Sequence, residues 1–129
     1  MREFEDLQKR KVDLAKKLLD KLVGASAKLA VAEELKQHEL VEEWLTKYAV
    51  ALGELLDLSK RQQALCPKEN QCISLLQDEI TGLNTAIQHV KNVVKGADLN
   101  QILISQVLIL VSSRHTLVQL LKDSERLSA

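Results

Sequence analysis

A run of aliphatic residues in the second half of the chain repeats at alternating intervals of three and four positions. This spacing places all of its members on one face of an α-helix, where they correspond to the a and d positions of about three heptads. Such a face is stable only when it packs against another helix. The run, which we call the aliphatic seam, therefore predicts an all-α helical bundle; its members are Ile73, Leu76, Ile80, Leu83, Ile87, Val90 and Val94.

The composition favours a single bundle domain over residues 1–129. Hydrophobic residues make up 46% of the chain, which argues against disorder, whereas aromatic residues make up only 2%. Aliphatic side chains usually fill the a and d positions of packed helices, and a chain of 129 residues has the size of one domain. We expect an elongated, antiparallel, up-down bundle of about three or four long helices with coiled-coil-like packing.

Two places in the chain carry clear signals for a turn. Pro67 predicts that a helix ends near Leu65, because proline disfavours helical geometry in the residue before it. Gly96 and Asp98 predict a second turn, in which the glycine ends one helix and the aspartate caps the next.

The boundary between the first two helices is less sharply defined. Gly24 and Ser26 could end one helix and cap the next, but the apolar pattern also slips in phase near His38. We place the break at Gly24, with separation near His38 as the alternative, and expect helices over about 3–23, 26–65, 69–95 and 98–126. Gly53 and Gly82 fall inside strong helical patterns, and we expect each to mark a close approach of two helices.

The last predicted helix begins with an uncharged stretch, residues 99–113, in which residues 107–111 are all apolar. Five consecutive residues point all round a helix, so the helix is either buried on every side or keeps an apolar surface for a partner. We expect a stripe through Leu103, Leu110 and Leu117 to face the third helix. The residues that point away from this stripe form a candidate partner-binding strip: Ile104, Val107, Leu108, Val111 and Val118.

Two aromatic residues give a second candidate contact with a partner. Trp44 and Tyr48 are one helical turn apart, beside an acidic segment. Tryptophan and tyrosine are enriched at protein interfaces, but they are also ordinary core residues with a polar tip. The sequence leaves both interpretations open.

The charges balance over the whole chain but not along it. There are 18 basic and 18 acidic residues, and this balance argues against a nucleic acid partner, which requires a surplus of lysine and arginine. Residues 33–57 lean acidic, whereas residues 2–21 lean basic. We expect these segments to form solvated, complementary faces of neighbouring helices; the basic residues include Lys9, Arg10, Lys11, Lys16, Lys17 and Lys21.

The sequence gives no sign of secretion or of a membrane span. Residues 1–23 lack the apolar centre of a signal peptide, and the longest apolar run, about ten residues, is shorter than the roughly 20 that cross a bilayer. Cys66 and Cys72 are close enough in sequence for a disulfide, but two cysteines do not make a disulfide-rich secreted scaffold. We expect free, partly buried thiols and a cytoplasmic, reducing location.

No group of residues predicts catalysis, a metal or a cofactor. His38 and Glu42 share a helix face but lack the second histidine of a zinc-protease motif. Ser112 and His115 are one turn apart, yet no acidic residue on that turn could orient the histidine. His89 lies beside the aliphatic seam and is expected to flank it. We therefore expect a protein that is not an enzyme.

These observations favour a protein-interaction module, such as a scaffold, an adaptor or an oligomerisation domain. It is expected to present an apolar helix groove to an amphipathic helix or peptide of another protein. The first alternative is an obligate homodimer, in which a second copy covers the apolar strip. The second alternative is a peripheral membrane or lipid-binding bundle that uses its basic first helix.

Overall fold

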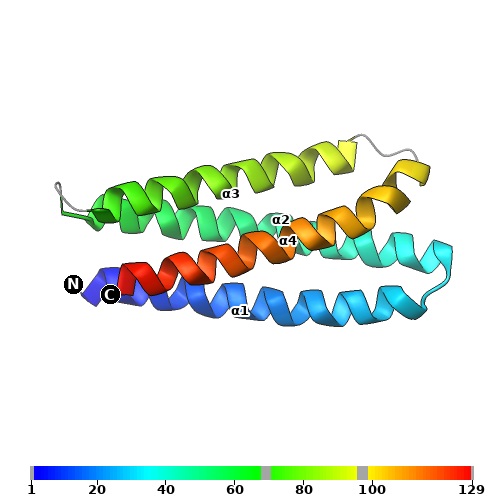
Figure 1. Cartoon of the computed structure of the whole chain (residues 1–129), viewed down its shortest axis with the longest axis horizontal. Coiled ribbons are helices and arrows are strands. Elements are labelled where there is room, and N and C mark those ends of the chain that lie inside the picture. Colours follow the sequence, from blue (N-terminus) through cyan, green and yellow to red (C-terminus); the bar gives the residue numbers. More distant parts are fainter. Residues whose placement is uncertain (1, 68–70, 96–98, 129) are drawn as a thin grey trace.

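The computed structural model describes residues 2–67, 71–95 and 99–128, without the side chains of residues 34, 35, 38, 93–109 and 128. These residues form four helices and no strand. The predicted all-α bundle is thereby confirmed (Figure 1). In chain order the helices are α1 (Arg2–Val31), α2 (Glu34–Leu65), α3 (Gln71–Lys95) and α4 (Leu99–Ser128).

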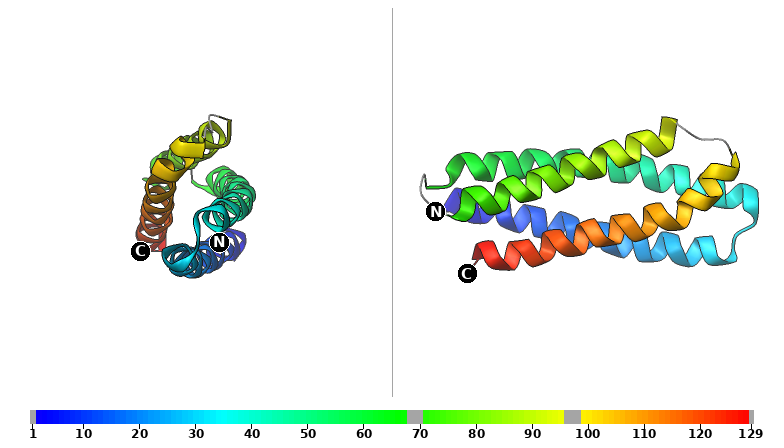
Figure 2. Two further views of the ribbon diagram at one scale, coloured as in Figure 1. Left: turned by 90° about the vertical axis from the view of Figure 1, so that its right-hand side faces the viewer. Right: turned by 45° about the horizontal axis from the view of Figure 1, so that its top comes forward.

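The four helices run alternately up and down and form an elongated bundle (Figures 1 and 2). α1 packs against α2 and α4, and α3 also packs against α2 and α4. α1 and α3 therefore occupy one diagonal of the bundle, as the end-on view shows (Figure 2). The start of α1, the end of α4 and the junction of α2 with α3 all lie at one end of the bundle (Figure 1).

The core consists mainly of leucines from the inner faces of the helices. It includes Leu18 and Leu22 of α1, Leu52 and Leu55 of α2, and Leu117 and Leu120 of α4. Burying each such side chain contributes roughly 1.5–3 kcal/mol. The aliphatic seam contributes the α3 side: Leu76, Ile80, Leu83 and Val90 are buried, Ile73 and Ile87 are half-buried, and the side chain of Val94 lies outside the described residues.

The predicted break at Gly24 is wrong. α1 continues through Gly24 to Val31, and α2 begins at Glu34, so the alternative boundary near His38 is closer to the structure. An exposed glycine costs a helix only about 1 kcal/mol, which is less than the packing of a long amphipathic face supplies. The side-chain amide of Gln37 donates a hydrogen bond to the Leu29 carbonyl at 3.1 Å and so satisfies a carbonyl near the end of α1.

Of the two other predicted helix breaks, the structure describes only the one at Pro67. α2 ends at Leu65, directly before Cys66 and Pro67, as expected. The turn expected at Gly96 and Asp98 lies outside the described residues.

Gly53 and Gly82 do not mark close approaches between helices, contrary to expectation. A Cβ atom placed on either glycine would meet nothing within 4 Å. Both residues face open space on the exposed surface of the bundle. The absence of a side chain at Gly82 instead helps to leave a hollow between α3 and α4.

Candidate functional site

A groove runs along the surface between α3 and α4. It consists of two adjoining hollows of about 470 Å³ and 300 Å³, which share four lining residues: Gly82, Thr85, His115 and Thr116. On α3 the lining extends from Asp78 to Val90, a distance of about 18 Å at the usual helical rise. We call this feature the α3–α4 groove.

Small side chains explain why the two helices leave space here. Gly82, Thr85 and Ala86 of α3 lie opposite Ser112 and Thr116 of α4 along the groove. Larger side chains at these positions would fill the space between two neighbouring helices, as they do elsewhere in a packed bundle. Buried residues close the floor; they are Tyr48, Leu83, Val90, Ser113 and Leu120, together with Glu79.

The groove differs in polarity between its two ends. Ala86, Val90 and Val111 line one end, where the side chain of Val111 is 61% exposed. Asp78 and Asp123 line the other end, together with the buried Glu79. No lysine or arginine is among the described residues that line either hollow.

Tyr48 forms the floor of the apolar end, and its ring stacks on that of Trp44. The ring centroids are 5.2 Å apart, and both side chains belong to the core. Burial raises the pKa of the Tyr48 phenol, while hydrogen bonding with Thr116 and Ser113 of α4 acts in the opposite direction. Of the two interpretations of Trp44 and Tyr48, the structure shows the core one; only Tyr48 also reaches the α3–α4 groove.

Beneath the acidic end of the groove lies a buried polar cluster drawn from all four helices. The Lys11 amine of α1 forms an ion pair with Oε1 of Glu79 on α3. The same amine donates a hydrogen bond to the Gln62 side chain of α2 at 2.7 Å, and the Ser59 hydroxyl donates one to Glu79 at 2.9 Å. The second carboxylate oxygen of Glu79 is buried and has no hydrogen-bond partner among the described residues.

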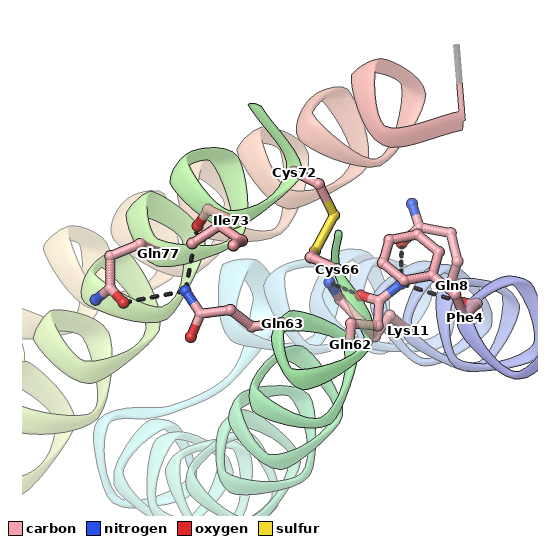
Figure 3. The surroundings of a disulfide bond; sticks show 9 residues. All are labelled: Phe4, Gln8, Lys11, Gln62, Gln63, Cys66, Cys72, Ile73 and Gln77. Atoms are coloured by element: carbon pink, nitrogen blue, oxygen red, sulfur yellow. Dashed lines mark hydrogen bonds between the residues drawn. A yellow bond between two sulfur atoms is a disulfide. The ribbon is translucent and has the colours of Figure 1, made fainter. Parts of the chain in front are cut away.

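Gln8 extends this cluster to α4. Its amide nitrogen donates a hydrogen bond to the Ser124 carbonyl at 3.0 Å. Its amide oxygen accepts one from Gln62 at 2.8 Å (Figure 3). Lys11 was expected on a solvated basic face, but the structure buries it completely, so that expectation is wrong. Burial lowers the pKa of the Lys11 amine, and the neighbouring carboxylates of Glu79 and Asp123 act to raise it.

Cys66 and Cys72 form a disulfide, so the expectation of free thiols is wrong. The bond joins the end of α2 to the start of α3 (Figure 3). The side-chain amide of Gln63 reinforces the same junction by donating hydrogen bonds to the Ile73 carbonyl and to Gln77, both at 3.1 Å. The proximity of the two cysteines across the Pro67 turn was the signal for this bond. The cytoplasmic location remains a prediction.

The predicted partner-binding strip is only partly described. Val111 is exposed and lines the α3–α4 groove, and Val118 is half-buried. Ile104, Val107 and Leu108 lie outside the residues whose side chains are described. The stripe expected to face α3 is consistent with the burial of Leu117 and the partial burial of Leu110, whereas the side chain of Leu103 is not described.

The histidines do not form a metal site in the described structure. His89 and His115 are exposed on opposite walls of the groove, and the side chain of His38 is not described. Among the described residues, no three histidine, cysteine, aspartate or glutamate side chains converge as metal ligands would. Ser112 and His115 both line the groove, on consecutive turns of α4.

One further finding concerns membranes. Within the described residues, no helix combines the length and the apolar character that crossing a bilayer demands.

Comparison with the models of known protein families, with curated proteins and with solved structures gives no match to this chain.

Proposed function

We propose that this bundle is a non-enzymatic protein-interaction module whose α3–α4 groove receives a helix or extended peptide of a partner protein. The observation that carries the proposal is the groove itself, with an apolar, half-open end lined by Ala86, Val90 and Val111. Exposed apolar surface in a concave site is typical of places where a partner binds.

The dimensions of the groove suit a short segment. Its length of about 18 Å corresponds to about three helical turns, which is room for anchor residues at positions i, i+4 and i+7. The 470 Å³ of the apolar hollow lies within the range of ordinary binding pockets. The rest of the bundle is a rigid support, because its core holds both α3 and α4 against α2 and α1.

A groove-filling variant tests the proposal. Gly82→Leu places a bulky side chain in the centre of the groove, where a Cβ has open space, so the bundle itself should remain folded. Gly53→Leu is the matched control. Gly53 is also helical and exposed, and a Cβ on it would meet nothing within 4 Å, but it lines a hollow between α1 and α2. Circular dichroism and thermal unfolding establish that both variants are folded.

The binding measurement uses a display library of amphipathic helical peptides about 20 residues long, selected on the wild-type protein. We expect enriched peptides that bind wild type and Gly53→Leu equally and lose at least tenfold in affinity for Gly82→Leu. A library that yields no binder sensitive to Gly82→Leu would overturn the proposal. Light scattering on the same samples tests the homodimer: a dimer that Gly82→Leu dissociates would show that a second copy occupies the groove instead.

A further inference from the structure

The distribution of charge along the α3–α4 groove indicates which kind of segment can bind there. This inference rests on the proposed function, in which the groove receives a segment of a partner protein. We propose that the partner segment is a basic amphipathic helix: apolar anchors fill the Val90–Val111 end, and a lysine or arginine about two turns away pairs with Asp78 and Asp123. The groove thereby sets both the sequence class of the partner and its direction along α3.

The acidic end of the groove has two aspartates and no lysine or arginine among its described lining residues. Asp78 is exposed and Asp123 is half-buried, and neither makes an ion pair within the described residues. Asp123 accepts a hydrogen bond from Gln119 at 3.1 Å, which leaves its charge in place. A cation placed between these two carboxylates gains attraction from both.

The buried Lys11 does not cancel this charge. Its amine is paired with Glu79 and bonded to Gln62, so its charge is largely matched by one carboxylate beneath the groove. Lys11 also attracts Asp123, but its ion pair is with Glu79. Two carboxylates, Asp78 and Asp123, thus remain for the occupant.

The opposite end of the groove requires an apolar segment. No lysine, arginine, aspartate or glutamate is among the described residues that line the hollow around Ala86, Val90 and Val111. In the reversed direction the basic residue of the partner would lie at the apolar end, away from Asp78 and Asp123. That direction is therefore disfavoured, as is a partner with an acidic residue beside the two aspartates.

Helical geometry gives the spacing within the partner. Ala86 and Asp78 are eight residues apart on α3, which is about 12 Å along the helix. A partner helix that runs beside α3 covers this distance in about eight residues, so anchor and cation fall at i and i+7 or i+8, on one face. The flexible stem of lysine or arginine tolerates an error of about one turn.

The test uses one selected peptide whose affinity falls in the Gly82→Leu variant. It is compared with versions of the same peptide in which the lysine or arginine residues are replaced, one at a time, by glutamine or glutamate. We expect a single position, seven or eight residues from the main anchor, to lose roughly tenfold in affinity. The protein variant Asp78→Asn/Asp123→Asn should lose a similar factor and should no longer distinguish the parent peptide from the glutamine peptide.

Glu42→Gln/Glu125→Gln is the matched control, since it changes the net charge equally at exposed residues outside the groove. It should leave the affinity within about twofold. Groove-dependent peptides that carry no basic residue, or that are indifferent to Asp78→Asn/Asp123→Asn, would overturn this inference and leave the proposed function standing. A selection without any peptide sensitive to Gly82→Leu would overturn both.

Discussion

Lys11 and Glu79 form an ion pair across the diagonal of the bundle, although their helices α1 and α3 do not neighbour each other. The two side chains are 0% and 3% exposed. Each charge has given up its hydration, so the pair is stable only as a unit together with its hydrogen bonds to Ser59 and Gln62. The pair also links all four helices in one register, because Gln8 connects the same cluster to Ser124 of α4.

Removing one member of this pair should be far worse than removing both. We expect Lys11→Met to lower the free energy of unfolding by about 3–5 kcal/mol, because Glu79 is left charged in the core. The double variant Lys11→Met/Glu79→Leu should recover most of that loss. Urea denaturation followed by circular dichroism measures both values.

An exposed pair provides the control for this cycle. Lys47 and Glu43 form an ion pair at 2.8 Å with side chains 54% and 60% exposed, so Lys47→Met should change the unfolding free energy by about 0.5 kcal/mol or less. A loss in Lys11→Met no larger than in Lys47→Met, or a double variant as unstable as the single one, would contradict the interpretation.

The disulfide should make stability depend on the redox state. It closes a short loop between Cys66 and Cys72, and the chain-entropy model gives about 2 kcal/mol for a loop of this length. We expect a reductant to lower the urea midpoint of the wild type and to have no effect on Cys66→Ser/Cys72→Ser. A thiol assay on the denatured, unreduced protein should detect no free thiol; two thiols per chain would show that the bond does not form.

The sequence predicted the architecture well because two of its signals can be read from neighbouring residues. The aliphatic seam gives the buried face of one helix, and Pro67 gives the end of another. The seam residues that the structure describes are all buried or half-buried, and α2 ends where Pro67 requires. The first helix boundary was wrong because tertiary packing outweighed the weak local signal of Gly24.

The buried polar cluster could have been recognised from heptad spacing alone. On α2 the core positions Tyr48, Leu52 and Leu55 continue at intervals of four and three to Ser59 and Gln62, which are polar but equally buried. On α1, Lys11 follows the core residue Leu7 by four positions in the same way. Polar residues that keep the a and d spacing are therefore better assigned to the core than to a solvated face.

The groove, by contrast, could not be predicted from the sequence. It arises because small residues of α3 meet small residues of α4, and that register depends on how both helices pack on α1 and α2. The predicted strip contributes Val111 to the α4 wall of the groove, but nothing in the sequence indicated the α3 wall with Gly82 and Ala86. Gly82 does not mark the predicted contact between helices, because a Cβ on this residue would meet nothing within 4 Å.

Alanine at the exposed glycines should stabilise the protein. Gly53→Ala and Gly82→Ala each add a side chain where a Cβ meets nothing within 4 Å, so each should gain up to about 1 kcal/mol of unfolding free energy from helix propensity. The reverse change at an exposed helical position, Ala64→Gly, should lose a similar amount. Thermal unfolding measures all three; a loss in either glycine variant would restore the close-approach interpretation.

Tyr48 should make the bundle sensitive to alkaline pH. Burial raises the pKa of its phenol in the folded state above the ordinary value of about 10. Between these two pKa values the unfolded chain has released a proton that the folded chain retains, so the unfolding free energy falls as the pH rises through this window. Below pH 10 the phenol is protonated in both the folded and the unfolded chain, so the contribution of Tyr48 to the unfolding free energy is fully present.

The chain contains a single tyrosine, so absorbance near 295 nm follows its ionisation directly. In the folded protein we expect the titration midpoint above pH 10, and in urea at about 10. Tyr48→Phe should abolish the absorbance change and remove this contribution to the alkaline loss of stability, although it also removes the hydroxyl that interacts with Thr116 and Ser113. A midpoint at about pH 10 in the folded protein would place the phenol in water and contradict its position beneath the α3–α4 groove.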